Sequence, residues 1–296
     1  LEILMLRGSC MAIPSLQIEA FLALARQGSF SRAAKALHVT QSALSQRIAA
    51  LESGLEQTFF LRDRNGAKLT NSGQEFLRFA QAREAMEEEA LQALSKRGGS
   101  GYSGVIRIGL YSSIARSVVL PSLAPFLRAN PSVECSFLCR SMNELPQLLA
   151  RAEADIIILD RIWERESIER RHLGEEKYVL IEAVDAKARP LTFLDNDSDD
   201  LATEIFFSHQ KEKAPAYRRA FHHDCYGIID AVSAGLGTAV MSRHLLRGRK
   251  GIRISKSYRP VNFPVTLHFY RQAFTTKLQN AVIAQLERHC PHFLEK

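Results

Sequence analysis

The chain has 296 residues, of which 46% are hydrophobic and 24% are charged. This balance is typical of a globular protein with two or three domains, and it excludes a disordered or fibrous chain. The formal net charge of +7 is compatible with a polyanionic partner but does not by itself indicate one.

Cysteine usage and hydropathy favour a cytoplasmic protein with no membrane partner. The five cysteines are odd in number and sparsely spaced, so a secreted disulfide framework is not expected. No apolar run approaches the roughly 18 residues that a membrane span needs. Residues 1–13 lack the apolar core and cleavage site of a signal peptide.

The first predicted domain, residues 14–72, begins with two helices. An apolar face at positions i, i+3, i+4 and i+7 indicates the first helix, which Gly28 ends. That face consists of Ile18, Phe21, Leu22 and Ala25. Ser31 is expected to cap a short second helix, which turns Ala33 and Ala34 inward.

A third helix, predicted over Gln41–Ser53 with Thr40 as its N-cap, has two contrasting faces. Leu44, Ile48 and Leu51 point inward, whereas the opposite face is short and polar. Such a face suits a helix in the major groove, where Gln pairs with adenine and Arg contacts guanine or phosphate. The DNA-contacting residues predicted on the helices are Ser31, Arg32, Thr40, Gln41, Ser42, Ser45, Gln46 and Arg47.

Residues 59–70 are predicted to form a β-hairpin with a tight Asn-Gly turn, which would be a wing. Its Arg62, Arg64 and Lys68 are expected to reach phosphates or the minor groove. Without this hairpin, the helices could be merely a small domain with a solvated face. Net charge does not decide the matter, because residues 15–70 hold seven Lys and Arg against four acids, a net of only +3.

Three stretches of this region resemble the winged head of LysR-type transcriptional regulators. They are Ser29–Ile48 (SFSRAAKALHVTQSALSQRI), Leu51-Glu52 and Leu69–Gly73 (LTNSG). The resemblance implies a sequence-specific DNA-binding protein that regulates transcription. The chain departs from the family pattern at Glu56, where Gly is usual, and at Phe59-Phe60-Leu61-Arg62, where Leu-Phe-x-Arg is usual.

Residues 73–97 are predicted to form one long helix, followed by a Gly-rich hinge at residues 98–104. Along one face of this helix, six residues recur at steps of three and four, which is the spacing of a coiled-coil seam. The seam consists of Phe76, Phe79, Arg83, Met86, Ala90 and Ala93. The helix could pack on its own domain. The resemblance implies instead that it pairs antiparallel with a second copy, which would make a homodimer or homotetramer.

From Val105 onward, β-like apolar runs alternate with helical patterns, which predicts βαβ units and a largely parallel sheet. The predicted strands are 105–110, 133–138, 155–159, 177–182, 238–241 and 265–270, and the predicted helices are 113–129, 143–151, 228–234 and 275–288. The resemblance implies two subdomains like those of periplasmic solute-binding proteins. Subdomain I would be residues 105–160 with 266–296, and subdomain II residues 161–265.

The predicted fold class is therefore mixed: an all-α winged helix-turn-helix domain, a long linker helix, and an α/β body of two subdomains. A small-molecule effector is expected between the subdomains, at the carboxyl ends of strands. The candidate effector-binding residues are Ser112, Ser113, Ser141, Asn143, Phe207, Ser208, Val240 and Met241. Some of them open helices, whose N-termini attract anions, so an anionic effector is one option. For any single serine, a plain N-cap is the alternative.

No cofactor or metal is expected, because adjacent residues such as His222-His223-Asp224-Cys225 rarely converge on one ion. No nucleophile–base pair stands out, which argues against an enzyme. A solute-binding protein would need export, for which no signal segment is visible. The leading hypothesis is a regulator that binds double-stranded DNA and whose effector modulates that binding. RNA polymerase is a further candidate partner.

Overall fold

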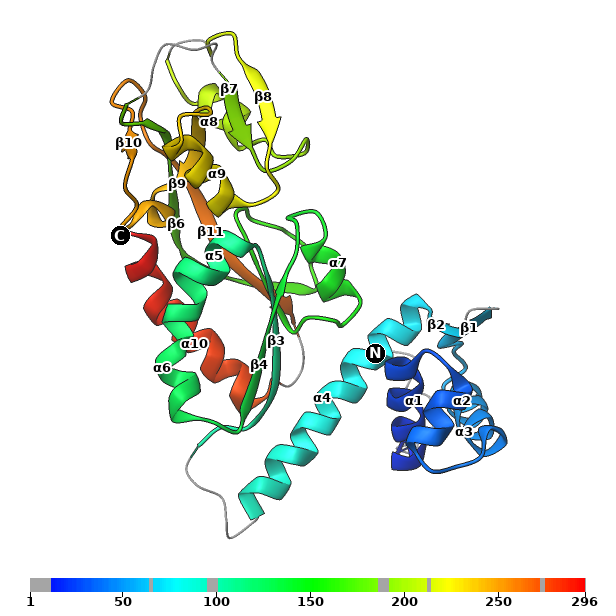
Figure 1. Ribbon diagram of the computed structural model, residues 1–296. Coiled ribbons are helices and arrows are strands. Elements are labelled where there is room, and N and C mark those ends of the chain that lie inside the picture. Colours follow the sequence, from blue (N-terminus) through cyan, green and yellow to red (C-terminus); the bar gives the residue numbers. More distant parts are fainter. Residues whose placement is uncertain are drawn as a thin grey trace. The chain divides into compact units, whose positions relative to one another are not determined.

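Figure 1 shows the computed structural model, which describes residues 12–63, 66–94, 101–185, 192–211, 214–271 and 275–295. The chain folds as two compact units, residues 1–97 and residues 98–296. In these described ranges, each helix is too short or too polar to cross a lipid bilayer.

The first unit is a helical domain with a small hairpin and a long helix. Its elements are α1 (Ser15–Gln27), α2 (Phe30–Ala36), α3 (Gln41–Gly54), β1 (Phe60–Asp63), β2 (Gly66–Leu69) and α4 (Asn71–Leu94). The predicted inward faces are confirmed, since Ile18 and Phe21 of α1 and Leu44, Ile48 and Leu51 of α3 are all buried. The core between the helices therefore forms as the helical periodicity predicts.

The two predicted helix caps differ in outcome. The Thr40 side chain accepts a hydrogen bond from the Ala43 N–H at 3.1 Å, which confirms it as the cap of α3. Helix α2 begins at Phe30, so Ser29 is its N-cap and Ser31 lies inside its first turn. The prediction of Ser31 as the cap is wrong, because both serines have the same capping propensity and only the path of the chain distinguishes them.

Four phenylalanines fill the centre of the first unit. The Phe21 ring lies edge-on to the rings of Phe59 and Phe76, at centroid distances of 5.6 and 4.7 Å. Phe59 stacks on Phe76 at 4.7 Å, and Phe60 packs against Phe21 at 5.1 Å. The Phe59-Phe60 pair, which departs from the family pattern, thus joins an aromatic core with favourable edge and stacking contacts.

The residues of the predicted seam on α4 lie in two different environments. Phe76 is buried in the aromatic core, whereas Phe79 and Met86 are exposed. Arg83 donates a hydrogen bond to the Ser15 hydroxyl at 2.9 Å. Arg83 therefore fastens α4 to the start of α1, and the seam is not a continuous apolar stripe.

The second unit alternates strands and helices. Its elements, in chain order, are β3 (Gly104–Leu110), α5 (Ser112–Ile114), the π-helix η2 (Ala115–Val119), α6 (Leu120–Ala129), β4 (Val133–Cys139), α7 (Leu145–Ala150), β5 (Ile156–Leu159), β6 (Ile168–Ala183), β7 (Thr192–Asp195), α8 (Ala202–Ser208), β8 (Arg218–Phe221), α9 (Cys225–Ser233), β9 (Ala239–Ser242), the 3₁₀-helix η3 (Arg243–Leu246), β10 (Ile252–Ile254), β11 (Val261–Tyr270) and α10 (Lys277–Leu294). The helix predicted over 113–129 contains a π-helical turn, and the strand predicted over 177–182 is the second half of the longer β6.

The central sheet is mixed rather than largely parallel, which corrects the prediction. Its strand order is β10-β6-β11-β5-β3-β4, with β9 also paired to β6. β3 runs parallel to β4 and β5, whereas β6 runs antiparallel to β9, β10 and β11. Local periodicity predicts that a segment is a strand but carries no information about the direction of its neighbour.

Two long strands, β6 and β11, run side by side and connect two lobes (Figure 1). In the first lobe, β6 residues 168–172 pair with β11 beside β5. In the second lobe, β6 pairs with β9 and β10. A register shift between Val265 and Thr266, opposite Gly174, marks the crossing. The chain thus leaves the first lobe within β6, later than the predicted boundary at residue 161.

Each lobe is a sheet with helices on both faces. In the first lobe, α6 and α10 cover the face that includes Ile158, and α7 covers the face that includes Ile157. In the second lobe, α9 packs on the face with Ile181, and α8 packs on the face with Leu180. Neighbouring residues of one strand therefore serve opposite cores, as the pleat of a strand requires.

Candidate functional site

The exposed polar face of α3 is the candidate DNA-reading surface. Gln41, Ser42 and Gln46 are exposed, and Ser45 and Arg47 are half-buried on the flanks of this face. The first turn thus presents amide and hydroxyl groups that both donate and accept hydrogen bonds, as reading of base edges requires. The five residues lie on α3 where the periodicity places them.

Two predicted contacts lie on α2. Ser31 and Arg32 are both exposed, and the Arg32 guanidinium donates a hydrogen bond to the Gln27 carbonyl at 2.7 Å. This bond orients the arginine at the end of α1 while leaving other guanidinium donors for a phosphate. The predicted contact Arg64 lies outside the described residues.

The predicted wing is confirmed as a hairpin of β1 and β2. Arg62 and Lys68 are exposed on its strands. The Ala67 N–H donates a hydrogen bond to the Gly28 carbonyl at 2.9 Å, which ties β2 to the end of α1. The wing cations are therefore carried by a hairpin that is fastened to the helical core.

The predicted effector residues of the first lobe lie near the carboxyl ends of β3 and β4. Ser112, Ser141 and Asn143 are exposed, and Ser113 is half-buried. The Ser141 hydroxyl donates to the Glu144 carboxylate at 2.6 Å. Since β3 and β4 are adjacent and parallel, their carboxyl ends place these polar groups at one edge of the sheet, as predicted.

The predicted effector residues of the second lobe are placed differently. Phe207, Val240 and Met241 are only 5, 5 and 6% exposed and belong to the cores beneath α8 and α9. Ser208 is exposed, but its hydroxyl donates to the Ile205 carbonyl of its own helix at 2.7 Å. The three apolar side chains serve the core, so we assign them no effector contact.

A chain of polar side chains, of which His244 and Glu176 are fully buried, joins the lobes. The Ser117 hydroxyl lies 2.8 Å from Nδ1 of His244, and Nε2 of His244 lies 2.7 Å from Oε1 of Glu176. The Tyr111 hydroxyl donates to Oε2 of Glu176 at 2.8 Å. The side chains of His244 and Glu176 are 1 and 0% exposed. We call these four residues the interlobe chain.

Sequence reasoning missed the interlobe chain. Glu176 and His244 are 68 residues apart, and no local spacing connects them. No local signal marks Glu176, because it stands between Glu175 and Lys177 in a polar stretch of β6. Only its burial shows that this carboxylate needs a partner. Only the pairing of β9 with β6 carries His244 to it.

Negative charge gathers around Glu176. Burial, and then the charge of Glu176, raise the pKa of Asp160 to about 6. The same two causes raise the pKa of the Tyr111 hydroxyl and that of Tyr178. Among the described residues, this region therefore disfavours an additional negative charge.

Further contacts between the lobes involve α5, η2 and α9. The Ser112 hydroxyl lies 3.8 Å from the Cys225 sulfur, and burial raises the pKa of this thiol. The Arg116 guanidinium lies 4.2 Å from the centre of the Tyr226 ring, a cation–π contact. Ser112, predicted as an effector residue, is thus already in contact with the second lobe.

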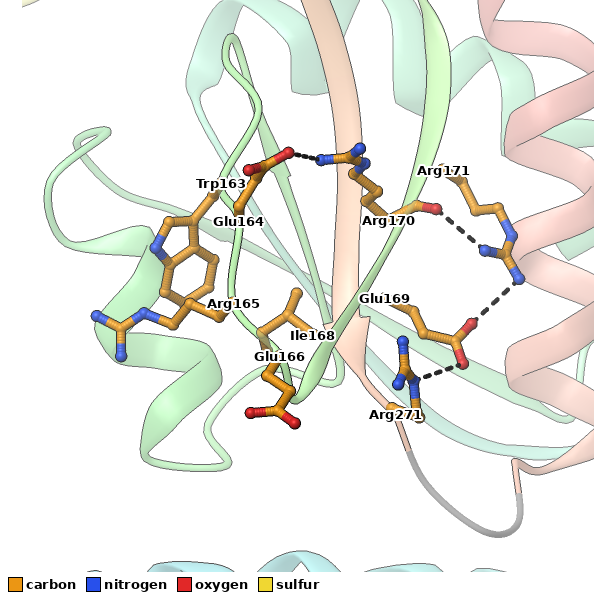
Figure 2. A pocket seen from close by; sticks show the side chains of 9 residues that line it. All are labelled: Trp163, Glu164, Arg165, Glu166, Ile168, Glu169, Arg170, Arg171 and Arg271. Carbon is orange, nitrogen blue, oxygen red and sulfur yellow. Dashed lines mark hydrogen bonds and ion pairs between the residues drawn. The ribbon is translucent and has the colours of Figure 1, made fainter.

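A separate hollow of about 570 Å³ lies beside the start of β6, and Figure 2 shows it. Two of its arginines are paired with carboxylates: Arg170 with Glu164 at 2.6 Å, and Arg171 with Glu169 at 3.2 Å. Arg271 lies 3.7 Å from Glu169. None of the predicted effector residues lines this hollow, so it is not the predicted cleft.

The winged head with its exposed polar helix, and the two-lobed α/β unit, together define a DNA-binding regulator with a ligand-sensing domain. Residues 16–74 match the family described as "Bacterial regulatory helix-turn-helix protein, lysR family", and residues 99–291 match the "LysR substrate binding domain". The chain belongs to the LysR family of bacterial transcription regulators and is not an enzyme.

Similar proteins are regulators of the same type. The "Uncharacterized HTH-type transcriptional regulator YvbU" of Bacillus subtilis is 26% identical over 78% of this chain and 82% of its own length. DgdR of Burkholderia cepacia is 29% identical over 76% of each chain. The transcriptional activator IlvY of Salmonella typhimurium is 33% identical over 48% of each.

Solved structures share the fold. ArgP from Mycobacterium tuberculosis has a TM-score of 0.75 at 20% identity, with 92% of this chain and 95% of that chain covered. Full-length LysG from Corynebacterium glutamicum, solved with bound effector Arg, has a TM-score of 0.72 at 18% identity, with 94% and 97% covered. At these identities, the likeness concerns the fold alone.

Proposed function

We propose that α3 is the recognition helix and reads promoter DNA in the major groove. Gln41, Ser42 and Gln46 would contact base edges, with Ser45 and Arg47 on the flanks of the contact. The observation that carries this proposal is the exposure of these polar groups on a helix whose opposite face is fully buried. Side chains at the N-terminal end of a helix reach furthest into the groove.

Around α3, the exposed groups of α2 and the wing would hold the head on the DNA backbone. We assign phosphate contacts to Arg32, Arg62 and Lys68, with the hydroxyl groups of Ser31 and Thr40 beside them. Backbone contacts fix the position of a protein on DNA without reading sequence, and they weaken as salt rises.

The test uses DNA selected by the wild-type protein from a random-sequence library. Replacing Gln41, Ser45 and Arg47 by Ala should lower binding of the selected DNA by at least a hundredfold, because each lost base contact is worth about 1–3 kcal/mol. Binding to unrelated DNA should change far less. Ser53→Ala, at the far end of the same helix, is the matched control. Selective binding that survives the triple change would overturn the assignment of α3.

A second part of the proposal is that α4 pairs with the α4 of another copy. Apolar side chains that the head does not cover lie along this helix: Phe79 is 49% exposed, Leu91 69% and Leu94 81%. The side chain of Ala93, also predicted in the seam, lies outside the described residues. Such exposure is costly in water, and pairing two heads raises the affinity for DNA through effective concentration.

The oligomeric state tests this pairing. Phe79→Glu combined with Leu91→Glu should shift the full-length protein toward monomer in sedimentation analysis. Leu16→Glu, at an exposed apolar residue of α1 (54% exposed), is the control and should leave the mass unchanged. If the double variant sediments as the wild type does, α4 is not the pairing surface.

The third part is an effector bound between the lobes, near Ser112, Ser113, Ser141 and Asn143. These groups lie at the carboxyl ends of adjacent parallel strands, where ligands of α/β sheets commonly bind. The carboxylates around Glu176 argue against an anionic group placed deeper between the lobes. An effector that carries an anionic group would therefore contact the exposed serines with it.

A thermal-shift screen of small carboxylic acids and amines tests the effector site. A ligand present at about a hundred times its Kd should raise the unfolding free energy by about 2.7 kcal/mol. Ser112→Ala together with Ser141→Ala should reduce that shift, whereas Ser198→Ala, on an exposed loop, should not. A shift that is unchanged in the double variant would place the ligand elsewhere.

A further inference from the structure

We propose that the interlobe chain is a proton-dependent lock: with a proton shared between His244 and Glu176 it holds the lobes together, and without it the lobes separate more readily. This goes beyond the effector proposal, because the lock acts in the protein without ligand.

The interlobe chain draws its members from both lobes. Ser117 lies on η2 and Tyr111 precedes α5, both in the first lobe. His244 lies on η3 of the second lobe, and Glu176 lies on β6 just beyond the crossing at Gly174. Movement of one lobe against the other must therefore lengthen at least one of the distances of 2.7 to 2.8 Å.

The hydrogens of the chain can be counted. The Ser117 hydroxyl donates its one hydrogen to the Ser113 carbonyl, 2.5 Å away in the preceding turn. Its oxygen must then accept from Nδ1 of His244, which requires a hydrogen on Nδ1. The Tyr111 hydrogen lies on the other side of Glu176. The close contact between Nε2 and Oε1 needs one more hydrogen, so His244 and Glu176 together carry a shared proton.

Removal of this proton leaves two arrangements, and each lacks one hydrogen bond. If His244 keeps its hydrogen on Nδ1, the lone pair of Nε2 faces the carboxylate of Glu176. If the hydrogen moves to Nε2, the Ser117 hydrogen must turn to Nδ1. The Ser117 and Ser113 oxygens then stay close with no hydrogen between them. A buried polar group without its partner is unfavourable, so either form weakens the link between the lobes.

Titratable and charged groups from several elements surround the pair. Tyr111 faces Glu176 from the first lobe, and Tyr178 lies beside it on β6. The carboxylate of Asp160 is close enough to act on both tyrosines, and that of Asp200 on Tyr178. Nearby arginines are engaged elsewhere. Arg116 and Arg249 flank the Tyr226 ring on α9, and Arg161 lies 4.0 Å from Asp160. Among the described residues, the ion-pair partner of Glu176 is His244.

The substitution Glu176→Gln should keep the hydrogen bonds between the lobes but remove their dependence on a shared proton. In Glu176→Gln, the amide nitrogen donates to Nε2 of a neutral His244, and the amide oxygen accepts the Tyr111 hydrogen. All links of the chain are then satisfied without the extra proton. This variant should keep the lobes together and lose the pH dependence.

Hydrogen–deuterium exchange of the full-length protein, corrected for intrinsic exchange rates, tests the lock between about pH 5 and pH 8, where histidines titrate. In the wild type, protection of residues 111–119 and 239–246 should fall about fivefold as pH rises, which corresponds to the loss of one hydrogen bond. Protection in α10 should change only by the amount that titration of Asp160 contributes, and should stay constant in Asp160→Asn. Glu176→Gln should show the higher protection at every pH.

Two further variants exclude other causes. Tyr111→Phe removes one link but not the shared proton, so protection should drop at all pH values while the pH slope remains. Asp160→Asn removes the nearby carboxylate whose pKa is raised to about 6, and a slope should again remain in residues 111–119 and 239–246. A wild-type profile without slope would overturn the proposal. So would a slope that persists in Glu176→Gln or disappears in Asp160→Asn.

Discussion

The carboxylate of Glu52 on α3 accepts hydrogen bonds from the backbone N–H groups of both Phe59, at 2.7 Å, and Phe60, at 3.1 Å. One half-buried side chain thus ties α3 to the first strand of the wing. The position of the wing beside α3 depends on this link and on the aromatic core beneath it.

Glu52→Ala should loosen the wing. The variant leaves two backbone donors without their acceptor, which costs about 1–3 kcal/mol. Hydrogen exchange of residues 59–63 should therefore accelerate by tenfold or more. Glu52→Gln keeps an acceptor oxygen and should lose less. Equal protection in all three proteins would show that the carboxylate does not hold the strand.

Glu56→Gly should stabilise the head. Glu56 follows α3 with a φ of +51°, and the Gln57 N–H bonds to the Glu52 carbonyl at 3.0 Å, which is the geometry of a Schellman cap. A side chain in this left-handed conformation costs about 1 kcal/mol relative to Gly. The expected gain is about 0.5–1 kcal/mol, read from slower exchange of the core amides of α1. Glu56→Ala is the control. It retains a Cβ, so a gain there would attribute the effect to charge instead.

Gly73→Ala should destabilise the junction of wing and α4. A Cβ at residue 73 would lie 2.3 Å from the Phe59 carbonyl oxygen. Because this oxygen belongs to the backbone, it cannot move away without distorting the chain. The expected loss is about 1–3 kcal/mol, with weaker DNA binding. Gly54→Ala is a matched control on α3, since nothing lies within 4 Å of its added Cβ. It should be neutral or slightly stabilising, and a similar loss in both variants would argue against the steric explanation.

Asp160→Asn should stabilise the second unit at neutral pH. Burial and Glu176 raise the pKa of Asp160 from 3.8 to about 6. The folded state therefore holds this proton up to about pH 6, whereas the unfolded chain releases it near pH 4. Stability contributed by Asp160 is thus lost as pH rises through this window, and the full penalty is present above it.

For this substitution we expect a gain of about 1–3 kcal/mol at pH 7 and none below about pH 4. Unfolding followed by the fluorescence of Trp163, the single tryptophan of the sequence, reports on the second unit. Asp185→Asn, at an exposed position, should have no such effect. A gain that is the same at both pH values would rule out titration of Asp160 as its source.

The sequence alone determined the head. Helical periodicity placed Leu44, Ile48 and Leu51 in the core and the polar residues of α3 on its exposed face, and the turn chemistry after Phe59 predicted the wing. These features follow from spacings of three, four or two residues, which are visible within a short window. The same local reasoning failed where two neighbours were chemically equivalent, as for the serines that flank Phe30.

The arrangement of strands and helices in the second unit was decided only by the tertiary structure. The mixed sheet, the crossing at Gly174 and the burial of Phe207, Val240 and Met241 depend on which strands pair and which helices cover them. The interlobe chain depends on pairing between segments 68 residues apart. Strand pairing and charge burial are long-range properties, and one sequence carries no local pattern for them. Side-chain spacing can therefore predict the helices of the head and their buried faces, but not the groups that link the lobes.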